Sequence, residues 1–502
     1  MTDGTGATLP SFENERETLR STALGHEAAG RAGEALAAAW SILDTAPDDR
    51  QTKALIARLL LDSPDLIGPD RASSLHALLD DADVDPWFIG PAGWVLLSRE
   101  TPLLQASAAP DDVGRWLETN LLAQRLLRET HVANLDVEIS LTALRRWLLL
   151  SGRWPTFPRS VAALAAQTVR NGGAWLFDAE EDERLGTEGD TDVARAYRPP
   201  PPYDVVRPAQ ADPTTRAVAG QYESFPYPAW SRVMVSKTTT LPRLIEKLDP
   251  GGPRGTPPLR AEILVAGCGT GREAAIWARQ CPDAHITAID ISEASLRYGA
   301  ERCAAAGLRS ITFLALDLHD VASLETRFDA ITCSGVLHHL PDPEAGWEAL
   351  VRVLKPGGVM HVMVYSAVAR LRIRAAQTLI ADLAAQPVDA DLLRAVRRRL
   401  VEKAPALVAG SPDFYTLASV FDLLLHRHEI AFDVPRIMRA IETLGLVFLG
   451  YGLPPRRRAA QHRTGAPIGA LYRDIAAWAR LERDDPFLFS QMYEFWCRKP
   501  LS

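Results

Sequence analysis

The sequence predicts an α/β protein in which a seven-stranded, doubly wound sheet follows an all-helical N-terminal region. From residue 261 onward, short apolar strands alternate with helix-length segments, which is typical of a parallel sheet covered on both faces. Before residue 171 the apolar residues instead recur at three- and four-residue spacing, as amphipathic helices require. The change of period separates two architectures within one chain.

Seven segments have the composition of strands. Five of them (AEILVAG, HITAID, ITFLAL, FDAITCS and GVMHVMVYS) lie between residues 261 and 366. About three helices, one of them the Arg-rich stretch 392–403, interrupt the alternation over 367–432. A helix is expected at 433–445, with Asp433 as its N-cap and Pro435 in its first turn. Two last strands follow, LVFLGYG (446–452) and MYEFWCRK (492–499), which completes the predicted sheet.

The N-terminal region is expected to be helical throughout. Residues 22–49 predict an amphipathic helix pair, which resembles one tetratricopeptide-type repeat without a clear second copy. One repeat cannot bury its own apolar face, so the pattern does not establish a solenoid. The acidic run 178–192 is expected to be a solvated turn, and four prolines at 199–202 predict a stiff connector. Further helices are expected at 111–129, 138–151 and 158–171.

Composition limits the class of protein. The net charge of −8 disfavours a general nucleic-acid binder, and we expect no nucleic-acid partner. The five cysteines form no CxxC pair, so neither a disulfide framework nor a zinc site is indicated, and a reducing compartment is expected. The sequence shows no secretory signal and no run of 18 apolar residues, which predicts a soluble, cytoplasmic protein without a membrane partner.

The segment Val265-Ala-Gly-Cys-Gly-Thr-Gly-Arg-Glu273 predicts a ligand-binding turn between a strand and a helix. Its alternate glycines permit a tight turn and leave no Cβ to block a ligand lying against the backbone. Amide groups at the start of the following helix suit a carboxylate as well as a phosphate. The segment lacks the G-K-[ST] ending of a phosphate-binding loop, and its G-x-G-x-G spacing differs from the dinucleotide fingerprint G-x-G-x-x-G. The turn alone leaves dinucleotide binding open.

The glycine turn resembles motif I of class I S-adenosylmethionine (SAM)-dependent methyltransferases. Further stretches fit that family in order. Asp290 ends the second strand, Asp317 follows the third, SGVLHHLPDP (334–343) follows the fourth, and LKPGG (354–358) precedes the fifth. The resemblance implies a Rossmann-like methyltransferase core, with SAM as cofactor and S-adenosylhomocysteine as product. The cofactor-binding residues that we expect are Gly267, Cys268, Gly269, Thr270, Gly271, Asp290, Ile291, Asp317, Leu318, Ser334, Gly335, Tyr222 and Tyr227.

The resemblance also suggests roles for these residues. Asp290 would accept hydrogen bonds from the ribose hydroxyls, and Asp317 holds the position that meets the adenine amino group in the family. The aromatic and proline-rich segment 222–230 is expected to be either a lid that excludes water from the sulfonium or an apolar clasp between domains. Tyr222 and Tyr227 belong to this segment.

Catalytic candidates follow from residue type and position. His338 and His339 lie in the loop after the fourth strand, where a neutral imidazole serves as general base or merely shapes the cofactor pocket. On a continuous helix, Asp422, His426 and Glu429 would share one face, and we expect His426 and Glu429 to bind or deprotonate an acceptor or to form surface ion pairs. The pattern is not HExxH, and no metal is expected.

Two acceptor classes are disfavoured. Nucleic-acid amino-methyltransferases carry a [DNS]-PP-[YFW] tetrapeptide where this chain has Ser334-Gly335-Val336-Leu337. Arginine methyltransferases carry two glutamates on a loop where this chain offers only Glu344. The leading hypothesis is therefore methyl transfer to O, N or C of a small molecule. The alternatives are a protein methyltransferase that docks its substrate on the N-terminal helices, and a SAM-sensing binding module without turnover.

The order of motifs also resembles bacterial multidomain methyltransferases with a helical, repeat-like N-terminal region. In that family the forms are closer to QYEENPYPRW and DLLFHVQE than to the stretches at 221–230 and 422–429 of this chain. The differences leave the acceptor and the oligomeric state open. We expect five parts, which are an all-helical domain (1–198), a connector and lid (199–250), the SAM-binding core (251–366), a helical cap (367–432) and the C-terminal part of the core (433–502).

Overall fold

The sheet in the C-terminal half has all seven predicted strands. A computed structural model describes residues 9–101, 104–105, 107–199, 213–252, 258, 260–452, 474–485, 488–489 and 492–501. The predicted proline connector 199–202, apart from Pro199, and a basic stretch at 454–463, expected to be a surface loop, lie outside these residues. The strands are β1 (Glu262–Ala266), β2 (His285–Asp290), β3 (Ile311–Ala315), β4 (Phe328–Ser334), β5 (Leu354–Tyr365), β6 (Val447–Tyr451) and β7 (Met492–Arg498).

The strand order is β3-β2-β1-β4-β5-β7-β6. Strands β1 to β5 are parallel, whereas β7 lies between β5 and β6 and runs antiparallel to both. The sequence pattern did not predict this reversal, because composition carries no information on strand direction. The fifth strand also begins at Leu354 and so includes the stretch LKPGG, which was expected to precede it.

Successive residues of β1 face opposite sides of the sheet, and both sides are buried. Ile263 and Val265 pack in one apolar cluster with Trp277 of α14 (Arg272–Gln280). Leu264 and Ala266 pack in another, with residues of α16 (Pro343–Val353), α21 (Val434–Thr443) and α24 (Ile475–Asp484). This two-sided burial is why the strands are continuously apolar. Asp433 caps α21 through the Arg436 amide, as predicted.

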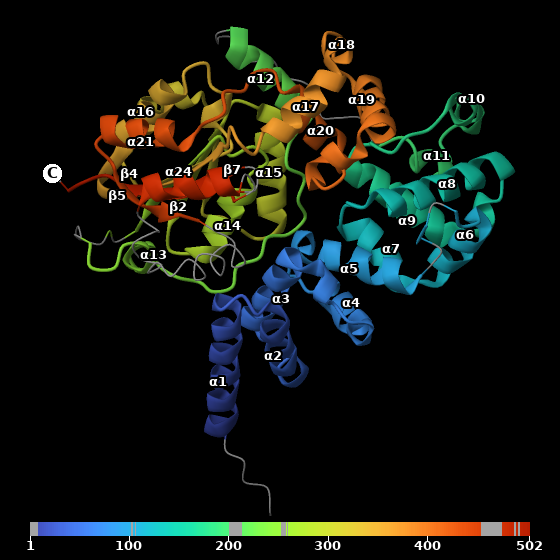
Figure 1. The fold of residues 1–502 in the computed structure, drawn as a ribbon, viewed down its shortest axis with the longest axis horizontal. Coiled ribbons are helices and arrows are strands. Elements are labelled where there is room, and N and C mark those ends of the chain that lie inside the picture. Colours follow the sequence, from blue (N-terminus) through green and yellow to red (C-terminus); the bar gives the residue numbers. More distant parts are fainter. Residues whose placement is uncertain are drawn as a thin grey trace, which may run out of the picture.

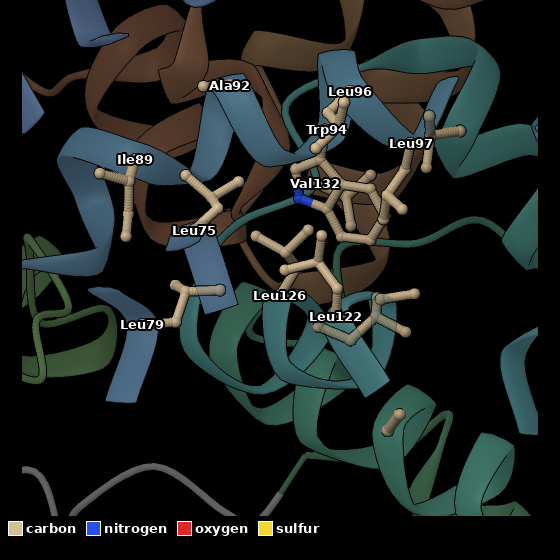
Figure 2. Packing of buried hydrophobic residues seen from close by; sticks show 14 of the residues in the cluster. Leu75, Leu79, Ile89, Ala92, Trp94, Leu96, Leu97, Leu122, Leu126 and Val132 are labelled. Carbon is tan, nitrogen blue, oxygen red and sulfur yellow. The ribbon is translucent and has the colours of Figure 1, made fainter. Parts of the chain in front are cut away.

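The N-terminal region is all-helical and has its own apolar core. Figure 2 shows part of this core, in which Ile89, Trp94 and Leu97 of α5 pack with Leu122 and Leu126 of α7. Its helices are α1 (Leu9–Ala28), α2 (Ala32–Thr45), α3 (Arg50–Asp62), α4 (Ala72–Asp80), α5 (Pro86–Glu100), α6 (Pro110–Thr119), α7 (Leu121–Glu129), α8 (Leu135–Ser151), α9 (Pro158–Asn171), α10 (Ala179–Glu188) and α11 (Asp192–Arg195).

Two expectations for this region were wrong in detail. The helix expected at 111–129 is interrupted at Asn120, whose side chain caps α7 by accepting a hydrogen bond from Ala123. Most of the acidic run 178–192 forms α10 rather than a turn, because Asp178 and Glu181 form a reciprocal capping box at its start. Among the helices that the structure describes, none combines the length and the apolar character of a membrane span.

The insertion after β5 lies between the sheet and the later N-terminal helices, α8 to α11 (Figure 1). It consists mainly of α17 (Leu371–Leu379), α18 (Ala381–Ala384), α19 (Ala390–Lys403) and α20 (Leu417–Leu425), with a short 3-10 turn at Pro412–Tyr415. Before the sheet, α12 (Pro213–Ser224) and α13 (Leu241–Leu248) flank the aromatic segment 225–230, and α15 (Glu293–Ala305) follows β2. Ion pairs Arg272–Asp85 and Arg279–Asp83 join the core to the N-terminal helices.

Candidate functional site

A cavity of about 480 Å³ lies at the carboxyl ends of the parallel strands. Open α/β sheets bind ligands at this edge, and the volume is within the range of small-molecule sites. The walls come from the strand ends, from α12 and the segment after it, and from the insertion. The lining residues include Tyr222, Tyr227, Pro228, Gly267, Cys268, Gly269, Arg272, Glu273, Asp290, Ile291, Asp317, Leu318, Ser334, Gly335, His339, Tyr365, Asp413 and Asp422.

The glycine turn forms the floor of this cavity. Gly267 has φ +68° and Gly269 has φ +49°, both in the region that glycine tolerates best. A Cβ on Gly267 would lie 2.3 Å from the Val336 side chain, and one on Gly269 would lie 2.7 Å from the Tyr227 carbonyl oxygen. Thr270 faces away from the cavity and donates hydrogen bonds to the carbonyl oxygens of Tyr227 and Pro228. The turn therefore needs its glycines and holds the aromatic segment in place.

Asp290 connects the end of β2 to the glycine turn. Its Oδ2 accepts a hydrogen bond from the Gly269 amide at 2.7 Å, and its Oδ1 accepts one from the Ser292 amide at 2.9 Å. Burial raises the pKa of this carboxyl, and the two amide hydrogen bonds offset only part of that effect. Asp317 lines the same cavity after β3, where its side chain accepts a hydrogen bond from the His319 amide.

The opposite wall is a cluster of hydroxyl and carboxyl groups. The Tyr222 hydroxyl donates to Asp422 Oδ1 at 2.6 Å, and the Tyr365 hydroxyl donates to Asp422 Oδ2 at 3.1 Å. Three elements far apart in the sequence (α12, β5 and α20) thus meet at one buried carboxylate. The Tyr227 hydroxyl donates to Asp413 Oδ1 at 3.1 Å. Burial and the nearby Asp422 charge raise the pKa of Asp413 to about 6.

The two histidines after β4 have different surroundings. His339 lines the cavity, and its Nδ1 lies 2.8 Å from the His428 carbonyl oxygen, so that nitrogen carries the proton. His338 lies behind it, where its Nδ1 accepts a hydrogen bond from the Tyr365 amide at 3.2 Å. Burial and the neighbouring imidazoles lower the pKa of His339 to about 3, and burial lowers that of His338 well below its usual range. Both rings are neutral at physiological pH.

The expected helix face of Asp422, His426 and Glu429 is wrong. Helix α20 ends at Leu425, and His426 has φ −50° and ψ +136°, which is not helical. His426 therefore turns back to stack on His339, with ring centroids 3.5 Å apart. Glu429 forms an ion pair with the buried Arg370 instead of facing the cavity.

His339, Asp422 and His426 bring possible metal-ligand atoms within 4.8 Å of one another. Their orientation does not fit a common metal ion. The two imidazole planes are stacked at 16°, whereas lone pairs that bind one ion must converge within the ring planes. His426 Nδ1 accepts a hydrogen bond from the His428 amide at 3.1 Å, which leaves the proton on Nε2, 3.2 Å from the Tyr222 hydroxyl. The cluster is therefore a hydrogen-bond network in this conformation.

The charge of the cavity fits a net-positive ligand such as SAM. Its lining contains five carboxylate side chains (Glu273, Asp290, Asp317, Asp413 and Asp422). Arg272 is the single guanidinium among the lining residues that the structure describes, and it pairs with Asp85 at 2.5 Å. A sulfonium and an ammonium group would compensate this excess of negative charge. The bare glycine turn beside Asp290 also suits a ligand that approaches the backbone closely.

The structure places most, but not all, of the sequence-predicted residues in the lining of the cavity. Gly267, Cys268, Gly269, Ile291, Leu318, Ser334, Gly335 and both tyrosines line the cavity with Asp290 and Asp317, whereas Thr270 and Gly271 support the turn from behind. Sequence reasoning missed Tyr365, Asp413 and Arg272 as cavity residues. Tyr365 ends β5, a position that could have been singled out, because strand ends at this edge line the ligand site. Asp413 belongs to a short turn with no recognisable pattern.

Comparison with known proteins agrees with this geometry. A family profile described as a methyltransferase domain matches residues 264–360. An uncharacterized protein of Synechococcus sp. is 35% identical over 271 residues, which cover 48% of this chain and 61% of that protein. A ubiquinone biosynthesis O-methyltransferase of Alkalilimnicola ehrlichii is 40% identical over 105 residues, covering 20% of this chain and 39% of the enzyme. The chain thus spans only part of the relatives it matches.

Among solved structures, PKMT2 from Rickettsia typhi in complex with AdoHcy is similar over 53% of this chain and 55% of that one, with 15% identity and a TM-score of 0.39. The family profile is the stronger comparison. It begins within β1, spans the glycine turn, Asp290, Asp317 and the histidine pair, and ends within β5. This match, and the sheet that surrounds it, show that the chain contains a Rossmann-like methyltransferase domain.

Proposed function

We propose that this protein transfers a methyl group from SAM to a small-molecule acceptor held in the cavity between the sheet, the insertion and the segment after α12. The observation that carries the proposal is the two-sided construction of the cavity. One side has the glycine turn with Asp290 and Asp317, and the other has the network centred on Asp422. The acceptor atom (O, N or C) is left open.

The cofactor side would bind and orient. Asp290 is held by two amides and has its remaining lone pairs available for ribose hydroxyls, and Asp317 and Leu318, which line the cavity, would face the adenine. When bound, SAM supplies a methyl group on a sulfonium, which a nucleophile takes up by in-line displacement. Alignment and exclusion of water account for most of the acceleration of such a transfer. Tyr222 and Tyr227 cover the cavity and would contribute to that exclusion.

On the acceptor side, the groups that line the cavity are His339, Tyr222, Tyr365 and Asp422. The proton of His339 on Nδ1 leaves a lone pair on Nε2, which is able to accept a hydrogen bond from an acceptor group. His426 acts through Tyr222 and His339, so we assign it a positioning role and not a catalytic one. Glu429 would act more indirectly, because its ion pair with Arg370 holds that guanidinium against the Tyr365 ring.

Calorimetric titration with S-adenosylhomocysteine tests the cofactor half of the proposal. We expect saturable binding to the full chain, and no heat of binding at millimolar ligand would overturn the proposal. Incubation with methyl-labelled SAM and a size-fractionated cell extract tests the acceptor half. Label in the small-molecule fraction is the expected result, whereas label confined to protein would favour a protein substrate.

The positioning role of His426 has a separate test. His426→Gln should leave the affinity for S-adenosylhomocysteine within about twofold and lower kcat, because His426 contacts Tyr222 and His339 on the acceptor side and does not itself line the cavity. His285→Gln serves as the matched control, because His285 lies at the end of β2 that is away from the cavity. Unchanged turnover in His426→Gln would remove this residue from the acceptor side.

A further inference from the structure

A second cavity of about 310 Å³ adjoins the cofactor cavity. Its walls come from four separate parts of the chain, namely the N-terminal helices, the segment 227–231, Arg272 at the start of α14, and the 3-10 turn and start of α20 in the insertion. The N-terminal region contributes Trp87, Pro91 and His131 among others, and the insertion contributes Asp413 and Thr416. The cavity therefore exists only because the N-terminal helices dock against the catalytic half.

The two cavities share Tyr227, Pro228, Arg272 and Asp413 as lining residues. The hydrogen bond of 3.1 Å between the Tyr227 hydroxyl and Asp413 Oδ1 belongs to this common wall. Hydrogen bonds from Thr270 fix the backbone carbonyls of Tyr227 and Pro228. Rotation of the Tyr227 and Asp413 side chains would open the wall without moving the backbone.

The charged groups around the second cavity have partners in the protein. Asp85 pairs with Arg272 at 2.5 Å, and Glu129 pairs with Arg232 at 3.3 Å. The guanidinium of Arg170 donates to the Arg128 carbonyl oxygen at 2.9 Å. A charged ligand would have to compete with these contacts and lose its own hydration. An uncharged ligand has no such cost.

The remaining surface is apolar or neutral. Trp87, Pro91, Pro228 and Trp230 supply flat apolar faces. Among the residues that the structure describes, none forms a hydrogen bond with the buried Nδ1 of His131. The His131 ring meets Trp87 edge to face, with centroids 6.1 Å apart. A buried imidazole nitrogen without a partner is costly, and a ligand hydroxyl would supply that partner.

We propose that the second cavity holds the body of the methyl acceptor, and that this acceptor is an uncharged ring compound with a hydroxyl group. The inference rests on the proposed function, since it places the acceptor relative to the SAM cavity. The glycine turn and Asp290 line only the first cavity, so the second lacks the features that suit the cofactor. The common wall at Tyr227 is where the reacting end of the acceptor enters the first cavity.

Three probes of nearly equal size test the ligand class. They are p-cresol (neutral hydroxyl), benzylamine (cation) and benzoate (anion), each titrated into the full chain saturated with S-adenosylhomocysteine and followed by saturation-transfer NMR. We expect p-cresol to bind more tightly than either ion. Equal or tighter binding of benzylamine or benzoate, or no binding of p-cresol at millimolar concentration, would overturn the proposal.

Two variants locate the probe. Ser231→Trp fills the second cavity from residue 231, which does not line the first, and should weaken p-cresol binding at least tenfold. The matched control is Ser236→Trp, which puts the same side chain at an exposed position in a different hollow and should have no effect. Equal p-cresol binding by the two variants would refute the location.

His131→Phe provides a second route if Ser231→Trp does not fold. It keeps the ring and removes both nitrogens, and it should weaken p-cresol binding about fivefold to tenfold. Binding of p-cresol unchanged by this substitution would refute the role of His131. S-adenosylhomocysteine binding should be equal in all these variants and wild type. If wild type fails to bind S-adenosylhomocysteine, the proposed function fails; if it binds this ligand but not p-cresol, only the acceptor site fails.

Discussion

Arg397 of the insertion donates from Nη2 to both carboxylate oxygens of Glu138 in the N-terminal helices, at 2.9 and 2.8 Å. Both side chains are buried. Burial raises the pKa of Glu138, and the Arg397 charge counteracts this effect. The pair joins α8 to α19, and Arg397 also donates to the Phe414 carbonyl oxygen beside Asp413. The N-terminal helices are thereby connected to the Asp413 wall, which the cavity at the strand ends shares with the second cavity.

Removing one partner of this pair should destabilise the protein strongly. We expect Glu138→Leu to lower the free energy of unfolding by about 3–5 kcal/mol, because Arg397 would remain buried without its counter-charge. The double variant Glu138→Leu/Arg397→Met should lose less, because no uncompensated charge is left. Urea denaturation measures both. A double variant less stable than the single one would show that the carbonyl contacts of Arg397 outweigh its ion pair.

Asp290→Ala should weaken S-adenosylhomocysteine binding by about 1–3 kcal/mol, the scale of a lost hydrogen bond to a charged group. Loss of the hydrogen bond to the Gly269 amide also loosens the glycine turn. Calorimetry measures the change. Asp283→Ala, at an exposed position before the same strand, is the control and should bind like wild type. Equal affinity of the two variants would exclude Asp290 from the cofactor site.

Gly269→Ala should abolish tight binding of S-adenosylhomocysteine. The new Cβ would lie 2.7 Å from the Tyr227 carbonyl oxygen at a φ of +49°, so the turn must shift. Gly307→Ala separates the two effects, because Gly307 has φ +72° but no neighbouring atom within 4 Å of an added Cβ. That control should cost about 1–2 kcal/mol of stability and leave binding intact. Isothermal calorimetry and thermal unfolding distinguish the outcomes.

His361 predicts a pH dependence of stability. Burial lowers its pKa, but hydrogen bonds to Glu273 and Glu494 outweigh burial and raise it to about 9. A folded-state pKa above the unfolded value of 6.5 gives a stabilising contribution that is complete below pH 6.5 and is lost as pH rises to about 9. The interval corresponds to on the order of 3 kcal/mol.

Urea denaturation of wild type and His361→Gln between pH 6 and 9.5 measures this contribution. The difference in stability between the two proteins should shrink as pH rises through that range. Parallel curves would show that folding does not raise the pKa of His361. Because Glu273 also lines the cofactor cavity, His361→Gln should weaken S-adenosylhomocysteine binding as well.

The predictable part of the cofactor site depends on local sequence. The glycine turn, Asp290 and Asp317 each lie at the end of a strand or within two residues of it, and parallel strands bring their carboxyl ends to one edge of the sheet. Assigning the strands correctly is therefore enough to predict that these cofactor-site residues lie together. The acceptor side depends on where α20 stops and how the chain turns at His426, and residues 422–429 are equally compatible with a longer helix. That is why the shared helix face of Asp422, His426 and Glu429 was wrong and Asp413 was missed.

By itself, the sequence determined the seven strands, the glycine turn and the order of the carboxylates, because strand period and glycine spacing are properties of short segments. Only the tertiary structure decided that β7 lies antiparallel between β5 and β6. The same holds for the hydrogen bonds that Asp422 accepts from hydroxyl groups of α12 and β5, and for the second cavity beside Tyr227. These features join residues far apart in the chain, such as Tyr222 and Asp422, which are 200 positions apart. Their contacts depend on how whole domains pack, and that packing cannot be predicted from the pattern of residues within a short segment.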